Sequence, residues 1–231
     1  KGRHRICSQI TSWLVGYILS NFTPARGDMN AFAEGYAHED YFMQLARKNG
    51  VEVGATDPTP AVGNFLKFAV QLTGAKSVVE IGTNSGVGGL WVLQGLPNDG
   101  VLTTIDAERE HSKIARTVFE EADIPVTKYR IITGNLIDVV GKLADNSYEL
   151  IITRDAMDLF EIVQETFRLL KSGGLLIIDQ ALSNGKVADS TQRDPESIAR
   201  RDAIKVIKED ARWSSSVIPI GAGILVAHKL A

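Results

Sequence analysis

Short apolar runs alternate along the chain with longer stretches in which apolar residues recur every three or four positions. A short run rich in Val, Ile and Leu, bounded by glycine or polar residues, is typical of a strand buried on both faces. The stretches between the runs predict amphipathic helices. The seven predicted strands are residues 77–81, 101–105, 129–133, 148–153, 175–179, 217–220 and 224–227.

The order of these segments predicts the fold class. Strand and helix alternate through the first five strands, a pattern that predicts parallel pairing with helices on both faces. The last two strands are joined only through Gly221, Ala222 and Gly223, and so short a glycine turn implies an antiparallel pair. We therefore expect an α/β fold with a doubly wound, seven-stranded, mostly parallel sheet and a reversed last strand.

A glycine-rich turn follows the first predicted strand and leads into a helix. Gly82, Gly86, Gly88 and Gly89 would let a ligand approach the backbone, and the free amides of a helix start favour a carboxylate or phosphate. The alternative is a tight turn without a ligand. The spacing differs from G-x-G-x-x-G, which disfavours an NAD-dependent oxidoreductase. Glu80, inside the strand, needs a partner if it is buried.

Polar side chains follow the ends of other predicted strands. Asp106 ends the second strand about 20 residues after the glycine turn, where an acid can accept hydrogen bonds from both hydroxyls of a ribose or cap the next helix. Asn135 follows the third strand and either binds an adenine edge or caps the helix 136–143. Arg154 and Asp179 follow the fourth and fifth strands. All these ends should converge on one ligand site beside the first strand.

The chain before the first strand predicts further helices. Residues 1–29 are predicted to be an N-terminal extension whose apolar stretch, Ile10–Leu19, packs on the body or on a second subunit, and 21–28 reads as a linker. Residues 30–231 are predicted to form the main domain. On this basis we expect a homodimer.

Two segments of the main domain precede the first strand. Residues 30–49 predict one helix, stopped by Gly50. The prolines of Asp57-Pro58-Thr59-Pro60 make a rigid segment, and Thr59 or Pro60 should start a helix that ends at Gly74.

The composition of the chain limits the kinds of partner that we expect it to bind. A length of 231 residues suits one α/β domain with an extension, and a net charge of −3 gives no reason to expect nucleic acid. The single cysteine, Cys7, offers neither a disulfide framework nor a metal knuckle, and fits a reducing cytoplasm. No apolar run approaches the roughly 18 residues of a membrane span, so we expect no membrane partner.

Two motifs resemble a known family. The residues E-I-G-T-N-S-G at 80–86 and T-T-I-D at 103–106 are similar to the first two motifs of class I S-adenosylmethionine-dependent methyltransferases. The closest resemblance is to the O-methyltransferase family that includes the caffeoyl-CoA and catechol enzymes, in its bacterial branch, from about Glu34 to the C-terminus. P-T-P-A-V-G at 58–63 and G-G-L-L-I-I-D at 173–179 resemble further segments of that family.

The resemblance implies strand order 3-2-1-4-5-7-6, S-adenosylmethionine as cofactor and a small hydroxylated acceptor. Many members carry a serine at the position of Gly88 that holds the cofactor carboxylate, a role that Ser85 or helix amides would take here. The implied cofactor-binding residues are Pro58, Glu80, Gly82, Thr83, Ser85, Gly88, Asp106, Ala107, Asn135, Leu136 and Arg154.

The end of the fourth strand departs from the metal-dependent members. These members carry D-A-D-K there, in which the first Asp binds a divalent cation and the Lys acts on the acceptor, and Asp-Asn after the fifth strand. In this chain Arg154 replaces that Asp and Met157 replaces the Lys, while Asp179 and Gln180 stand where Asp-Asn is found. An arginine cannot bind a cation, so a degenerate metal site is favoured and Mg²⁺ is doubtful.

Alternatives remain at this position. A shift by one residue would let Asp155, Asp179 and Gln180 form an oxygen-ligand Mg²⁺ site. Without a metal, Arg154 would hold an anionic acceptor as a bidentate donor, or form a surface ion pair with Asp155 or Asp158. Arg154 and Asp155 are the catalytic candidates. The leading function is an O-methyltransferase for small molecules, and the main alternative is an S-adenosylmethionine-binding module without catalysis.

Overall fold

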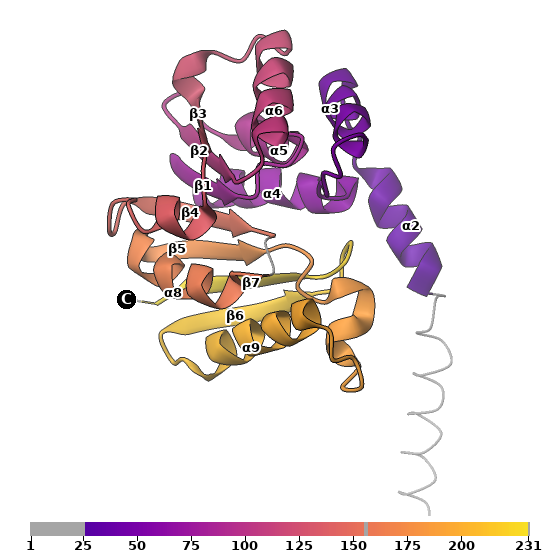
Figure 1. Cartoon of the computed structure of the whole chain (residues 1–231), viewed down its shortest axis with the longest axis vertical. Helices are drawn as coiled ribbons and strands as arrows, with labels where there is room; N and C mark the ends of the chain where they lie inside the picture. The colour runs from indigo at the N-terminus through magenta and orange to yellow at the C-terminus, as the bar shows by residue number, and fades with distance from the viewer. Residues whose placement is uncertain (1–25, 155–156, 231) are drawn as a thin grey trace, which may run out of the picture.

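A seven-stranded sheet forms the centre of the molecule (Figure 1). The structure is a computed structural model that describes residues 26–154 and 157–230, so the predicted helix at Ile10–Leu19 and the candidate Asp155 lie outside it. In spatial order the strands are β3 (Tyr129–Thr133), β2 (Val101–Asp106), β1 (Ser77–Ile81), β4 (Tyr148–Thr153), β5 (Leu170–Ile178), β7 (Ile224–Lys229) and β6 (Trp213–Ile218).

The pairing confirms the predicted fold class and strand order. The first five strands pair in parallel, and β7 runs antiparallel to both β5 and β6. The helices are α2 (Arg26–Tyr36), α3 (Tyr41–Val51), α4 (Pro60–Thr73), α5 (Val87–Gly95), α6 (Arg109–Glu121), α7 (Leu136–Val140), α8 (Leu159–Leu169) and α9 (Pro195–Glu209), with short 3₁₀ turns at Val126–Lys128 and Ser183–Ala188.

Successive residues of β1 enter different cores, which explains its unbroken apolar run. Val78 packs in a cluster with Leu66 of α4 and Trp91 of α5. Val79 and Ile81 point to the other face, in a second cluster that includes residues of α8 and α9. Because side chains of a strand alternate between the two faces of a sheet, a strand covered on both sides must be apolar throughout.

The region before β1 corrects two predictions. The single helix expected at 30–49 is wrong: α2 and α3 are separate, and Asp40 begins α3 by accepting a hydrogen bond from the Met43 amide at 3.0 Å. Gly50 does not stop the helix but is buried within α3, where an added Cβ would lie 2.6 Å from the Ser85 Cβ. Its small size lets α3 approach the glycine turn, a contact that local sequence cannot show.

The ends of the other helices and strands differ less from the predicted ones. The helix α2 begins at Arg26, inside the predicted linker, and projects beyond the sheet (Figure 1). The last turn of the helix expected at 136–143 is missing, and β6 lies at Trp213–Ile218 instead of 217–220. The helix from Pro60 to Thr73 is confirmed, with Thr59 as its N-cap and Gly74 ending it at φ 63°.

Among the helices that the structure describes, none has both the length and the apolar character needed to cross a membrane.

Candidate functional site

The glycine turn after β1 lies over a buried acid. Glu80 is 1% exposed, and its Oε2 accepts a hydrogen bond from the Thr104 hydroxyl at 2.8 Å, while its Oε1 has no partner among the described residues. Thr104 also hydrogen-bonds to the Thr83 hydroxyl at 2.7 Å. Burial raises the pKa of Glu80 to about 7, although the neighbouring Arg154 lowers it. Glu80 therefore titrates near neutral pH.

Gly88 makes room for this acid. A Cβ at Gly88 would lie 2.3 Å from Glu80 Oε1 and 3.2 Å from Arg154 Nη2. The serine that many relatives carry at this position would therefore collide with Glu80 unless one of them moved. Gly82 has φ 98°, a conformation that favours glycine, and the Arg154 side chain passes close to it.

Asp106 points back toward the turn. Its Oδ2 accepts a hydrogen bond from the Asn84 amide at 2.8 Å, and its Oδ1 accepts one from the Glu108 amide at 2.9 Å. His111 Nδ1 lies 3.2 Å from the same Oδ1, and His111 Nε2 lies 3.3 Å from the Val53 carbonyl. A carboxylate has about four lone-pair sites, so Asp106 keeps capacity on Oδ2 for a further hydrogen bond.

The proline loop, residues 54–59, covers the turn and occupies part of its hydrogen-bonding capacity. Asp57 accepts hydrogen bonds from the Ser85 amide at 3.2 Å and the Ser85 hydroxyl at 2.5 Å. The Thr56 amide donates to Asn84 Oδ1 at 2.9 Å. The helix start therefore binds carboxylates of the protein itself, as its amides favour, and Ser85 is already engaged.

A buried ion pair lies where β4 and β5 end. Arg154 is 5% exposed, and its Nη1 donates to the Thr56 carbonyl at 3.0 Å. Its Nη2 lies 3.6 Å from Asp179 Oδ2, and Asp179 is 2% exposed. The surface position expected for an ion pair of Arg154 is therefore wrong, and the partner Asp155 considered for it lies outside the described residues. Arg154 Nε, Arg154 Nη2 and Asp179 Oδ2 have no hydrogen-bond partner among the described residues.

The turn after β5 carries the other predicted metal ligand. Gln180 has φ 57°, and its amide donates to Asp179 Oδ1 at 2.7 Å. Within residues 26–154 and 157–230, no group of three or more His, Cys, Asp or Glu side chains is placed to hold a metal ion. Met157, at the position of the catalytic lysine in metal-dependent relatives, is 71% exposed.

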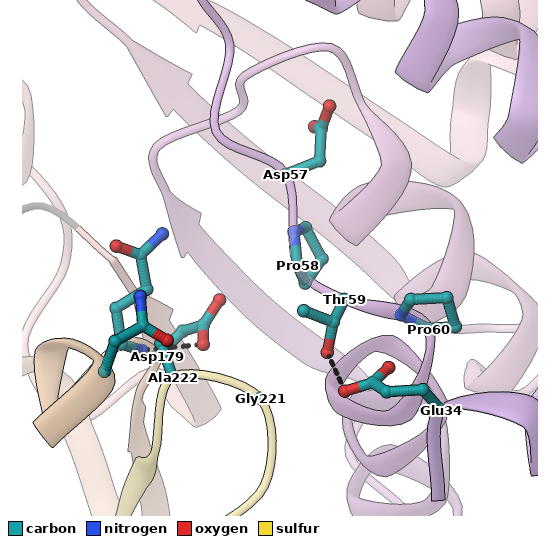
Figure 2. A pocket seen from close by; sticks show the side chains of 10 residues that line it. Glu34, Asp57, Pro58, Thr59, Pro60, Asp179, Gly221 and Ala222 are labelled. Carbon is teal, nitrogen blue, oxygen red and sulfur yellow. Dashed lines mark hydrogen bonds between the residues drawn. The ribbon is translucent and has the colours of Figure 1, made fainter. Parts of the chain in front are cut away.

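A cavity of about 500 Å³ opens between the proline loop and the turns after β5 and β6 (Figure 2). Asp57 and Pro58 lie on one side, and Asp179 and Ala222 on the other. Glu34 of α2 closes the end of the cavity and binds the first turn of α4, accepting from Thr59 Oγ1 at 2.8 Å and the Ala61 amide at 2.9 Å. The cavity is lined by Glu34, Asp57, Pro58, Thr59, Pro60, Asp179, Gln180, Asn184, Gly221 and Ala222.

The structure thus brings Pro58, Asp179 and Gln180 to one cavity, with Arg154 bound to its loop and to Asp179. The candidates Ala107 and Asn135 lie apart from that cavity and are exposed, and Leu136 is buried. The Asn135 side chain caps α7 by accepting from the Asp138 amide at 3.1 Å.

Sequence reasoning missed several residues of this region. Glu34, Asp57 and Asn184 line the cavity, and His111 contacts Asp106. Asp57 precedes Pro58 in the segment that the prolines predict to be rigid, so its place beside the site could have been predicted from the sequence. His111 follows Asp106 by five residues, in the first turn of the next helix, but nothing in the sequence shows its second contact, with the Val53 carbonyl.

Known proteins with similar sequences identify the family of this chain. The chain matches a family model for O-methyltransferases over residues 36–230. A Mycobacterium tuberculosis relative named "Probable O-methyltransferase" is 44% identical over 206 residues, which cover 88% of this chain and 92% of the relative. A Mycobacterium marinum relative with the same kind of name is 42% identical over 206 residues, with the same coverage.

Solved structures extend the comparison. A Corynebacterium glutamicum protein has a TM-score of 0.82 at 30% identity, over 90% of this chain and 98% of its own. A Bacillus cereus O-methyltransferase, solved in complex with S-adenosylhomocysteine, has a TM-score of 0.79 at 23% identity, over 87% of this chain and 97% of its own, and shares the fold. The chain belongs to the O-methyltransferase family, the S-adenosylmethionine-dependent enzymes that methylate hydroxyl oxygens.

Proposed function

We propose that this protein methylates a hydroxyl oxygen of a small molecule without a divalent metal, and that Arg154 provides the positive charge of the site. The observation that carries this proposal is the buried guanidinium at the end of β4, 3.6 Å from the carboxylate of Asp179. In the metal-dependent relatives, the resemblance places a cation-binding Asp at the position of Arg154. In this proposal, the fixed positive charge of Arg154 takes the place of the metal in those enzymes.

The buried polar atoms fit the methyl donor. S-Adenosylmethionine carries an ammonium, a carboxylate and a sulfonium at its methionine end, and when bound it supplies an electrophilic methyl group. Glu80 Oε1, under the glycine turn, is a buried acceptor with no partner among the described residues. Buried polar atoms normally have partners, so this acceptor favours a ligand that carries a donor such as the ammonium group. Asp106, with its remaining acceptor capacity, would hold the ribose.

The chain's own groups can prepare the acceptor. A hydroxyl becomes a good nucleophile when it loses its proton, and a nearby guanidinium stabilises the resulting oxyanion. Asp179 lines the cavity, and in this proposal its carboxylate accepts that proton. The new bond joins the acceptor oxygen to the methyl carbon, and the bond from methyl carbon to sulfur breaks. The products are a methyl ether, S-adenosylhomocysteine and a proton on Asp179.

The test is methyl transfer to a panel of phenols, starting with catechol, in the presence of EDTA or of Mg²⁺. We expect turnover that EDTA changes less than about twofold, because Arg154 replaces the metal charge. Arg154→Met should lower kcat by about 100-fold, the size typical of losing one oxyanion-stabilising group. The matched control is Arg212→Met, which removes an exposed arginine paired with Asp210.

Two outcomes would contradict the proposal. Loss of turnover in EDTA, restored by Mg²⁺, would show that a metal is bound and would favour Asp155 with Asp179 as ligands. Binding of S-adenosylhomocysteine by calorimetry, without turnover of any phenol, would favour the binding-module alternative.

The assembly and location remain proposals as well. We propose a homodimer in the cytoplasm, supported by the apolar stretch at Ile10–Leu19 and by the single cysteine. Light scattering on the full chain should give twice the mass of one chain, and a monomer would contradict the assembly.

A further inference from the structure

We infer that Arg200 of α9 is a positioning residue, which fixes the distance between Arg154 and Asp179 by binding the main chain of both. This inference rests on the proposed function, since those two residues act on the acceptor there. Arg200 Nη1 donates to the Asp179 carbonyl at 3.2 Å, and Arg200 Nη2 donates to the Arg154 carbonyl at 3.4 Å. One guanidinium thus connects the ends of β4 and β5.

The two strand ends need such a connection. The last register pair of β4 and β5 is Thr153 with Ile178, and the Asp179 amide still donates to the Thr153 carbonyl at 2.8 Å. Beyond this point the ladder between the two strands ends. The planar fork of an arginine can bind two carbonyls at once and hold both at fixed positions.

The turn after β5 adds a second reason. Gln180, Ser183 and Asn184 all have positive φ, of 57°, 44° and 53°. Non-glycine residues in this conformation store strain and persist only where the surroundings hold them. Arg200 binds the carbonyl of the residue just before Gln180, so it holds the start of this strained turn.

The burial of Arg200 is hard to explain by packing alone. It is 2% exposed, on the face of α9 that also buries Ala203 and Ile207. Among the residues that the structure describes, its carboxylate partner is Glu196, at 3.1 Å, whose side chain is 42% exposed. Burying a charge is expensive, and an apolar residue would fill this position at lower cost. The main-chain contacts at the site account for the arginine.

The test compares two arginines that both bind carbonyls. Arg200→Met keeps the apolar volume of the side chain but removes both carbonyl contacts. Arg200→Lys keeps the charge but lacks the planar fork whose two nitrogens reach the two carbonyls. The matched control is Arg168→Met. Arg168 donates to the carbonyls of Leu143 and Val140 at 3.0 and 3.3 Å, away from the cavity.

The first readout needs no acceptor. In ¹H–¹⁵N spectra of arginine side chains, the Nε proton of Arg154 should exchange with solvent about tenfold faster in Arg200→Met and be unchanged in Arg168→Met. Arg200→Lys should give an intermediate rate. Unchanged exchange in both Arg200 variants would overturn the inference. Failure of both Arg200 variants to fold, while Arg168→Met folds, would also overturn it, because Arg200 would then serve stability alone.

The second readout is methylation of catechol. In Arg200→Met, kcat should fall about tenfold or more, while KM for S-adenosylmethionine changes less than about threefold, because the predicted ribose site lies on β2. An equal loss of kcat in Arg168→Met would overturn the inference. If the unaltered protein methylates no phenol but the Arg154 exchange rate responds as expected, the proposed function fails and the positioning role stands.

Discussion

Replacing Asp106 with alanine is the most direct test of the donor site. The carboxylate accepts hydrogen bonds from the amides of Asn84 and Glu108 at 2.8 and 2.9 Å, and faces His111 at 3.2 Å. Asp106 is buried, so water replaces these contacts only in part. The variant therefore changes both the proposed ribose site and the conformation of the glycine turn.

The two effects have different sizes. A hydrogen bond to a charged group contributes about 1.5–3 kcal/mol, and the contributions are not additive. We expect Asp106→Ala to lower the free energy of unfolding by about 2–4 kcal/mol, because two buried amides lose their acceptor. Loss of the ribose hydrogen bonds should weaken donor binding by about 1–3 kcal/mol, which raises Kd by roughly 5- to 150-fold.

Calorimetry with S-adenosylhomocysteine and urea unfolding measure these two effects separately. Asp99→Ala is the control, because Asp99 is an exposed acid whose partner is Lys76, and it should leave the affinity unchanged. A folded Asp106→Ala variant that binds S-adenosylhomocysteine with unaltered Kd would refute the ribose assignment. The proposal that the ribose binds at the end of β2 would then have to be abandoned.

Two further predictions concern the buried acid under the turn. Burial raises the pKa of Glu80 from 4.5 to about 7, so the native state keeps a proton that the unfolded chain releases, and stability should fall as pH rises through this window. Glu80→Gln should remove that pH dependence. Above pH 7 its free energy of unfolding, measured with urea, should exceed that of the parent by up to about 3 kcal/mol. The prediction would be contradicted if the free energies of unfolding of variant and parent changed in parallel with pH. Gly88→Ser should lower the unfolding temperature and weaken S-adenosylhomocysteine binding, because its Cβ would lie 2.3 Å from Glu80 Oε1. Gly35→Ala, with no atom within 4 Å of its Cβ, is the matched control and should not destabilise; a Gly88→Ser variant as stable as the parent would show that Glu80 moves freely.

The local pattern located the strands β1 to β5, whereas the strand order followed from the family resemblance. The strands β1, β2 and β4 are largely buried because both faces of the sheet are covered there, and their apolar runs are visible in the sequence itself. The break between α2 and α3 was not predicted, because apolar residues at helical spacing lie on both sides of residues 37–40 and the Asp40 cap was not recognised. Helix boundaries depend on such caps, which periodicity does not detect.

The site was predictable only in part, for a related reason. Asp106, Arg154 and Asp179 follow strand ends, so topology places them at the same edge of the sheet. The contact between Asp57 and Ser85 joins residues 28 apart through the fold, and no periodicity reports it. Arg200 looks like an ordinary charged helix residue until its carbonyl partners are known.

A site built on arginine has a consequence that a metal site lacks. A divalent ion is held by unpaired carboxylates, and its occupancy depends on its concentration and on pH. The guanidinium of Arg154 is always charged and arrives with the chain, so its position depends only on folding. That position is set by Thr56 in the proline loop, by Asp179 on β5 and, as inferred above, by Arg200 on its carbonyl. Three elements far apart in sequence must therefore fold correctly before the charge is in place, and substitutions in any of them should alter catalysis more than binding of the donor.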